Sequence, residues 1–224
     1  MNISPEVIIT GDGSKTLYLV GMNEQFHSVK GALTESRHVF IQHGLLYRKP
    51  FPGIRVLEAG FGTGLNALLT AWYAITSHTA VNYRGLEKFP LGKNILDKLD
   101  HGSFAGEKGR ELYRKIHDSK WDTEEELDIW FRLTKMECDM TAYVPDPEFS
   151  PDVVYFDAFG PDKQPEVWEL RVFEMLYQSM APQGVLVTYS AKGEVRRRLI
   201  SAGFAVERLP GPPGKREMLR AIKK

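Results

Sequence analysis

The sequence predicts an α/β fold with a mainly parallel sheet in residues 51–224, preceded by a small β-rich extension in residues 1–50. From residue 54 onward, short apolar segments alternate with longer helix-forming segments, which is the pattern of parallel strands joined by helices. A glycine-rich turn joins the first of these apolar segments to the first helix, and acidic residues end several later strands. The 224 residues suffice for one large domain with an extension, but not for two enzyme domains of ordinary size.

The individual elements follow from the apolar segments and the turns between them. In the extension, Val7–Thr10 and Thr16–Val20 flank the turn Gly11–Gly13 and predict a hairpin, and a short helix is expected near Ala32–Ile41. The charged segment 103–128 is expected to be helical. The main domain is predicted to contain strands at 54–58, 82–87, 130–136, 152–157, 184–189, 204–209 and 218–222, and further helices at 65–75, 91–99, 166–180 and 193–202.

The composition excludes several classes of protein. Hydrophobic residues make up 42% and charged residues 26%, which supports a packed core and excludes wholesale disorder. No apolar segment approaches the ~18 residues of a membrane span, and the N-terminus lacks the features of a signal peptide, so we expect a cytoplasmic protein with no membrane association. The single Cys138 excludes an internal disulfide, and the spacing of His27, His38 and His43 fits no compact zinc motif, so no metal is expected.

The charged residues are unevenly distributed, although the net charge is zero. Residues 118–169 contain fifteen acids and four bases, a net charge of −11, whereas residues 191–224 contain ten bases and three acids, a net charge of +7. The basic segment is suited to a polyanionic partner. Ordinary solvated faces are the alternative explanation for both segments.

The strongest local signal is the segment Glu58–Gly64, which reads Glu-Ala-Gly-Phe-Gly-Thr-Gly between a strand and a helix. Glycines at such a turn let the backbone pass close to a ligand, and the helix that follows offers free N–H groups. The segment is not a phosphate loop, because no Lys-Ser/Thr pair follows the last glycine, and its alternate glycines differ from the G-x-G-x-x-G fingerprint. A purely structural glycine turn remains the alternative.

Acidic residues stand at the carboxyl ends of the predicted parallel strands. Glu87 ends the second strand, Asp139 follows the third, and Asp157 ends the fourth. Ligands of open α/β sheets bind at the carboxyl ends of the strands. We therefore expect these three acids and Glu58 to surround one crevice.

The alternate glycines, with an acid two residues before the first of them, resemble motif I of class I S-adenosylmethionine-dependent methyltransferases. This resemblance implies a Rossmann-like fold with a mainly parallel seven-stranded sheet and S-adenosylmethionine as the cofactor. It also implies that Glu87 binds the ribose hydroxyls, that Asp139 lies beside the adenine, and that Asp157 lies next to the transferred methyl group. The cofactor-binding residues implied are Glu58, Gly60, Gly62, Thr63, Gly64, Asn66, Glu87 and Asp139.

Further segments resemble one particular group, the tRNA wobble-uridine methyltransferases that form 5-methylaminomethyl-2-thiouridine. The segments concerned are Phe26–Phe40, Phe61–Asn66, Asp157–Trp168, Val195–Leu199 and Gly214–Leu219, so the resemblance covers nearly the whole chain except 103–128. It implies methylation of the aminomethyl nitrogen on C5 of the uridine at position 34 of tRNA. In many bacteria this enzyme is fused to a flavin-dependent oxidase that prepares the substrate. Because no second glycine fingerprint follows Gly64, we expect the stand-alone methyltransferase form, with a separate oxidase as a candidate partner.

The resemblance also assigns roles to residues outside the cofactor site. Asp157 would orient the amine and accept its proton, and Phe159 would pack against the uracil, as aromatic residues do with splayed-out RNA bases. Arg197, Lys215 and Arg216 would contact tRNA phosphates.

Other functions remain open on the same sequence features. An aminopropyltransferase or a small-molecule N-methyltransferase would share the fold and the glycine motif. A DNA amino-methyltransferase is disfavoured, because residues 157–160 read Asp-Ala-Phe-Gly and not Asp/Asn-Pro-Pro-aromatic. A non-catalytic RNA-binding module that has kept a nucleotide pocket is the alternative from another class.

Overall fold

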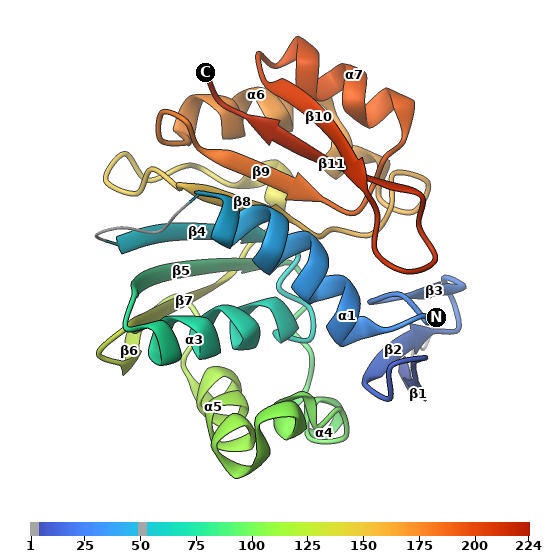
Figure 1. Cartoon of the computed structure of the whole chain (residues 1–224), viewed down its shortest axis with the longest axis vertical. Coiled ribbons are helices and arrows are strands. Elements are labelled where there is room, and N and C mark those ends of the chain that lie inside the picture. Colours follow the sequence, from blue (N-terminus) through green and yellow to red (C-terminus); the bar gives the residue numbers. More distant parts are fainter. Residues whose placement is uncertain (1–4, 49–52) are drawn as a thin grey trace.

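The computed structural model describes residues 5–48 and 53–224, and the expected α/β architecture is observed (Figure 1). One sheet has the strand order β10-β11-β9-β8-β4-β5-β7-β6, and its centre, β9-β8-β4-β5-β7, is parallel throughout. Antiparallel pairs extend it at both ends. The strands are β4 (Gly53–Ala59), β5 (Ala80–Glu87), β6 (Glu124–Asp128), β7 (Phe131–Glu137), β8 (Val153–Phe156), β9 (Val185–Thr188), β10 (Ala205–Pro210) and β11 (Glu217–Ile222).

This sheet has one strand more than the seven expected. The segment 103–128 is helical only in its first part, in η2 (His101–Ala105) and α5 (Gly106–Asp118). Its end forms β6, which pairs antiparallel with β7 at the edge of the sheet. The strand was missed because four of its five residues are acidic and give no apolar alternation. Charged side chains are common on edge strands, where they discourage pairing with other chains.

The first part of the chain forms a separate three-stranded antiparallel sheet of β1 (Pro5–Ile9), β2 (Lys15–Leu19) and β3 (Glu24–Gln25), so the predicted hairpin is confirmed. The short helix expected near Ala32–Ile41 is longer, running through α1 (Ala32–Ser36), the π-helical η1 (Arg37–Leu45) and α2 (Leu46–Arg48). The domain boundary expected between residues 50 and 51 lies outside the described residues and stays a prediction.

Helices cover both faces of the large sheet (Figure 1). The strand β8 is buried throughout, and its alternate residues join different hydrophobic clusters, with Tyr155 on one face and Phe156 on the other. The cluster around Tyr155 includes Phe40 of η1, so the helix that follows the small sheet belongs to the main core. The remaining helices are α3 (Leu65–Ser77), α4 (Lys93–Leu96), η3 (Met140–Ala142), η4 (Pro165–Trp168), α6 (Leu170–Ser179) and α7 (Gly193–Ser201).

The small sheet packs against the connection between β5 and α5. Leu17 of β2 is buried with Leu96 and Leu99, and Phe26 packs against the same cluster. Lys15 Nζ also donates a hydrogen bond to the carbonyl of Lys98 at 2.8 Å. These contacts place the small sheet beside the carboxyl ends of the central strands.

Within the described ranges, no helix combines the length and the apolar character that crossing a membrane requires.

The close packing of η1 on the sheet gives a test of the fold at Gly44. A Cβ added there would lie 2.9 Å from Val187 Cγ2 and 3.3 Å from Tyr155 Cε1. Helix propensity alone favours alanine over glycine by about 1 kcal/mol, whereas overpacking a core costs about 1–3 kcal/mol. We expect Gly44→Ala to lower the free energy of unfolding by about 1 kcal/mol in urea titrations. Gly160→Ala, where the nearest atom is 3.8 Å away, is the control, and an equally stable Gly44→Ala variant would contradict the packing described.

Candidate active site

A cavity of about 510 Å³ lies at the carboxyl ends of the central strands. Its walls come from the glycine-rich loop after β4, from the segments that follow β5, β7 and β8, and from the small N-terminal sheet. Glu87, Asp139 and Asp157 all line it, as the strand-end argument predicts. Glu58 does not line it, because its side chain is fully buried beneath the glycine loop.

The glycine loop brings the backbone close to its neighbours. Gly60 has a φ of +93°, and a Cβ there would lie 2.7 Å from the carbonyl oxygen of Asp157. Gly62 has a φ of +50°, and a Cβ there would lie 3.1 Å from the ring of Phe26. Both positions therefore favour glycine, because any other residue would be strained in this backbone conformation and its side chain would be crowded by these neighbours. Gly60, Gly62, Thr63 and Asn66 line the cavity, whereas Gly64 stands outside the lining, at the N-cap of α3.

Glu87 holds the glycine loop in place. Its Oε2 accepts the N–H of Gly62 at 2.9 Å and its Oε1 accepts the N–H of Phe89, also at 2.9 Å. Burial raises the pKa of the Glu87 carboxyl. A carboxylate has about four acceptor positions, so acceptor positions remain for hydroxyl groups of a ligand in the cavity.

Asp139 lies at another part of the cavity wall. Its carboxylate pairs with Lys88 Nζ at 2.7 Å and accepts the N–H of Thr141 at 2.9 Å. The hydrogen bond from Lys88 is the main reason that the pKa of Asp139 falls to about 2. Asp139 is therefore ionised over the working range of pH and acts as an acceptor.

Thr63 is fixed from the side of α5 and η2. Its carbonyl accepts the hydroxyl of Tyr113 at 3.1 Å and lies 3.1 Å from His117 Nε2, and its hydroxyl lies 3.1 Å from His101 Nε2. Burial lowers the pKa of His117 to about 4 and that of His101 well below its usual range, so both imidazoles are neutral near pH 7. These contacts hold the loop through neutral side chains, so they add no charge to the site.

Asn66 links the two buried carboxyl groups of the site. Its side-chain nitrogen donates to Glu58 Oε1 and to Asp157 Oδ2, both at 2.8 Å. The hydroxyl of Tyr83 donates to the other Glu58 oxygen at 2.6 Å. Among the described residues, Asn66 Oδ1 is buried without a hydrogen-bond partner, although Asn66 lines the cavity.

Burial and proximity of like charges perturb both carboxyl groups. Burial raises the pKa of Glu58 to about 8, so Glu58 is mostly protonated at pH 7. The pKa of Asp157 also lies well above its usual range, first because of burial and then because Glu58 and Glu35 are near. The hydrogen bond from Asn66 and the charge of Lys215 act in the opposite direction. Asp157 is thus a stronger base than an ordinary aspartate, and it faces the cavity.

An aromatic wall stands next to Asp157. The rings of Phe26 and Phe159 meet edge to face, with their centroids 5.1 Å apart. The carbonyl of Phe159 accepts Trp168 Nε1–H at 2.7 Å, and its N–H donates to Gln164 at 3.1 Å. These two hydrogen bonds hold the backbone of Phe159 at the cavity.

Sequence reasoning missed the contribution of the small sheet to the site. Phe26 and His27 line the cavity, together with Pro5, Leu19 and Met22. The signal available was the segment Phe26–Phe40 itself, but strand-end reasoning does not apply to an element outside the large sheet. His27 is buried, and burial lowers its pKa to about 4.

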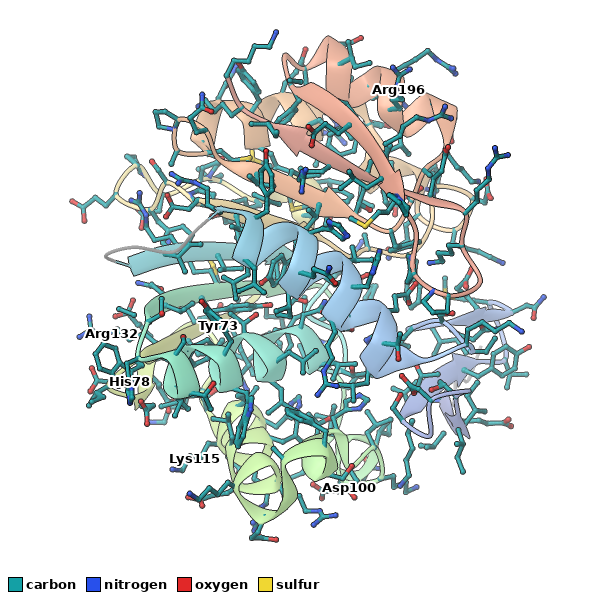
Figure 2. The ribbon with its side chains drawn as sticks, in the orientation of Figure 1. Tyr73, His78, Asp100, Lys115, Arg132 and Arg196 are labelled. Atoms are coloured by element: carbon teal, nitrogen blue, oxygen red, sulfur yellow. The ribbon has the colours of Figure 1, made fainter. Side chains whose placement is uncertain are left out.

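The basic residues expected to meet tRNA lie outside the cavity lining. Arg197 on α7 and Arg216 after β10 are exposed. The neighbouring Arg196 lies at the end of the molecule opposite to Asp100 and Lys115 (Figure 2). Lys215 differs from these arginines, because its Nζ is 2.7 Å from Glu35 Oε1.

No group of three or more His, Cys, Asp or Glu side chains in residues 5–48 and 53–224 is arranged to hold a metal ion.

Comparison with known proteins identifies the family. Residues 107–224 match the model of a family described as S-adenosyl-L-methionine-dependent methyltransferase, and this is more than half of the chain. The chain belongs to this family. Its fold is therefore the class I methyltransferase fold, and its cofactor is S-adenosylmethionine.

Individual relatives agree with this assignment. The chain is 36% identical to the tRNA 5-methylaminomethyl-2-thiouridine biosynthesis bifunctional protein MnmC of Ectopseudomonas mendocina, over 87% of this chain and 31% of the relative. The protein of the same name from Campylobacter hominis is 31% identical over 92% of this chain and 31% of the relative. The chain thus spans about a third of the length of these curated relatives.

Solved structures give the same assignment at the level of the fold. The crystal structure of MnmC2 from Aquifex aeolicus superimposes with a TM-score of 0.81 at 28% identity and covers 99% of this chain and 71% of that one. DesVI from Streptomyces venezuelae, at 13% identity and a TM-score of 0.51, shares the fold alone.

The buried Glu58 makes stability depend on pH in a defined direction. Its pKa rises from 4.5 to about 8 on folding, so between these values the folded state binds the proton and the unfolded state has lost it. Stability contributed by this group therefore falls as pH rises through the window, by at most about 1.4 kcal/mol per pH unit. Glu58→Gln removes this dependence and keeps the acceptor for Asn66. We expect the variant to gain stability relative to the unmutated protein between pH 5 and pH 8 in urea unfolding.

The exposed Glu148 is the control, because Glu148→Gln removes an acid of the same type from the surface. A difference between Glu58→Gln and the unmutated protein that stays constant with pH would show that Glu58 is ionised in the folded state.

Proposed function

We propose that this methyltransferase transfers a methyl group to the aminomethyl nitrogen of 5-aminomethyl-2-thiouridine at position 34 of tRNA. The observation that carries the proposal is Asp157, a carboxyl group with a raised pKa that faces the cavity beside the aromatic wall of Phe26 and Phe159. The names of the relatives, and the match of the Aquifex structure over nearly the whole chain, support the same substrate.

The residues around the cavity suit the cofactor. When bound, S-adenosylmethionine supplies an electrophilic methyl group on a sulfonium. We assign its ribose hydroxyls to Glu87, its adenine to the wall at Asp139, and its close approach to the backbone to Gly60 and Gly62. Glu58 and Gly64 support the loop from outside the cavity.

Asp157 prepares the amine for methylation. An ammonium has no lone pair, so the amine must be neutral when it reacts. Asp157 accepts a hydrogen bond from the amine, which aims the lone pair, and then accepts the proton that the nitrogen loses on methylation. A carboxylate with a raised pKa accepts this proton more readily than an ordinary aspartate does. Asn66 keeps the accepting oxygen in a fixed place.

The aromatic wall and the exposed arginines suit the RNA. We propose that Phe159 packs against the uracil and that Arg197 and Arg216 contact tRNA phosphates. A flavin-dependent oxidase remains the proposed partner that prepares the aminomethyl group, and the cytoplasm is the proposed location of both activities.

One experiment separates this function from its alternatives. The protein is incubated with S-adenosylmethionine and tRNA carrying 5-aminomethyl-2-thiouridine, and the nucleosides are then analysed by mass spectrometry. We expect a gain of one methyl group at the wobble nucleoside and none on tRNA with unmodified uridine. Transfer from decarboxylated S-adenosylmethionine would indicate an aminopropyltransferase, and tRNA binding without transfer would indicate an RNA-binding module.

The role of Asp157 predicts a specific kinetic defect. Asp157→Asn keeps the shape of the side chain but loses its charge and basicity, so single-turnover methyl transfer should fall by roughly 10²–10⁴. Cofactor affinity, measured by calorimetry, should change little, because the residue acts on the amine. The control is Asp162→Asn on the same loop, whose side chain is exposed. An Asp157→Asn variant that retains more than about a tenth of the rate at saturating tRNA and cofactor would remove the assigned role.

The phosphate contacts predict a change in salt dependence. Arg216→Ala and Arg197→Ala should each reduce the slope of log K for tRNA against log salt by roughly 0.7–0.9. Each variant makes one phosphate contact fewer and therefore releases fewer counterions when it binds tRNA. Cofactor affinity should be unaffected. Arg132→Ala is the control, since Arg132 is exposed on β7 at the opposite end of the sheet from α7 (Figure 2). Unchanged slopes in both variants would direct the RNA to another face.

A further inference from the structure

A partly buried ion pair joins two distant parts of the chain beside the cavity. Glu35 of α1 is only 5% exposed, and its Oε1 lies 2.7 Å from Nζ of Lys215 in the connection between β10 and β11. The other oxygen of Glu35 accepts the N–H of Ser28 at 2.7 Å. Figure 1 shows that this connection reaches from the large sheet towards α1 and β3. The Glu35 side chain is buried, whereas the Lys215 side chain is 33% exposed. A buried carboxylate is costly unless it is paired, so Glu35 needs a cationic partner at this place.

Lys215 is also in contact with the loop that carries Asp157. Its Nζ lies 3.8 Å from the centre of the Tyr189 ring, as in a cation–π contact. The hydroxyl of Tyr189 donates to the carbonyl of Ala158 at 2.9 Å. Ala158 follows Asp157 directly and lines the cavity. The ion pair is therefore connected, through one aromatic ring, to the backbone at the proposed proton acceptor.

The two charges act on Asp157 in opposite directions. Glu35 raises the pKa of Asp157 and Lys215 lowers it, so Lys215 offsets part of the effect of Glu35. The other groups that face Asp157 are Glu58 of β4, Asn66 of α3, Tyr83 of β5 and Tyr189 after β9. His27 of the small sheet also feels both charges of the pair, and burial lowers its pKa to about 4, so it is neutral.

We infer that Glu35 and Lys215 are a positioning pair, which fixes the loop of Asp157 through Tyr189 and keeps the charge of Lys215 neutralised beside the reacting amine. This inference rests on the proposed function. It also separates Lys215 from Arg216, because a lysine held by Glu35 and Tyr189 is not available to a phosphate. The expected phosphate contact of Lys215 would require this ion pair to break.

The test compares Glu35→Gln, Lys215→Met, the double variant and the conservative Lys215→Arg. Single-turnover methyl transfer is measured across pH at saturating tRNA and cofactor. The rate should rise with pH until the bound amine is neutral. In Glu35→Gln the unpaired lysine disfavours the ammonium form and should move this rising limb to lower pH, by on the order of one pH unit. In Lys215→Met the limb should move to higher pH. The double variant should restore its position, and Lys215→Arg should retain the unmutated profile.

Two further readouts keep the inference testable if one variant folds poorly or methyl transfer is absent. Titration of the Asp157 carboxyl carbon by NMR requires no substrate. It should show the pKa of Asp157 lowered in Glu35→Gln and raised in Lys215→Met. The salt dependence of tRNA binding should stay unchanged in Lys215→Met, in contrast to Arg216→Ala. Absence of methyl transfer in the unmutated protein would overturn the proposed function, but it would leave the inference about Glu35 and Lys215 to be decided by the NMR titration. Unmoved profiles and titrations in both single variants, or a slope reduced by roughly 0.7–0.9 in Lys215→Met, would overturn the pair.

Discussion

The site depends on one side-chain amide, that of Asn66, which donates to Glu58 and Asp157 at the same time. Two carboxyl groups this close to one nitrogen and this deeply placed do not both ionise readily, and both have raised pKa values. Glu58 takes the buried position, with Tyr83 as its second donor. Asp157 is left facing the cavity as a base held in a fixed orientation.

Contacts of the surrounding backbone keep these groups in position. Gly60 lets the end of β8 approach the glycine loop closely, and Glu87 holds the same loop through the N–H of Gly62. The small N-terminal sheet closes the cavity on another side and adds Phe26 to the wall at Phe159. The loop, the base and the aromatic wall therefore come from separate elements that meet only in the folded chain.

Much of this was predictable from the sequence, because parallel strands bring their carboxyl ends to one edge. That rule placed Glu87, Asp139 and Asp157 in one crevice, and the structure has them there. The rule failed for Glu58, because the Glu58 side chain is fully buried and accepts a hydrogen bond from Tyr83 instead of facing the cavity. The pairing of Lys215 with Glu35 joins residues far apart in the sequence, so charge patterning could only mark Lys215 as basic. The acidic edge strand β6 lacked the apolar alternation that reveals a strand.

The side-chain amide of Asn66 offers the most direct measurement of the central claim. Its ¹⁵N–¹H resonances can be followed by NMR from pH 5 to pH 9, with Asn66→Ala for assignment. The structure predicts that they shift as the two carboxyl groups titrate, with a step near pH 8 that Glu58→Gln abolishes. Resonances that stay constant over this range, or that respond equally in Glu58→Gln, would contradict the bridge between Glu58 and Asp157.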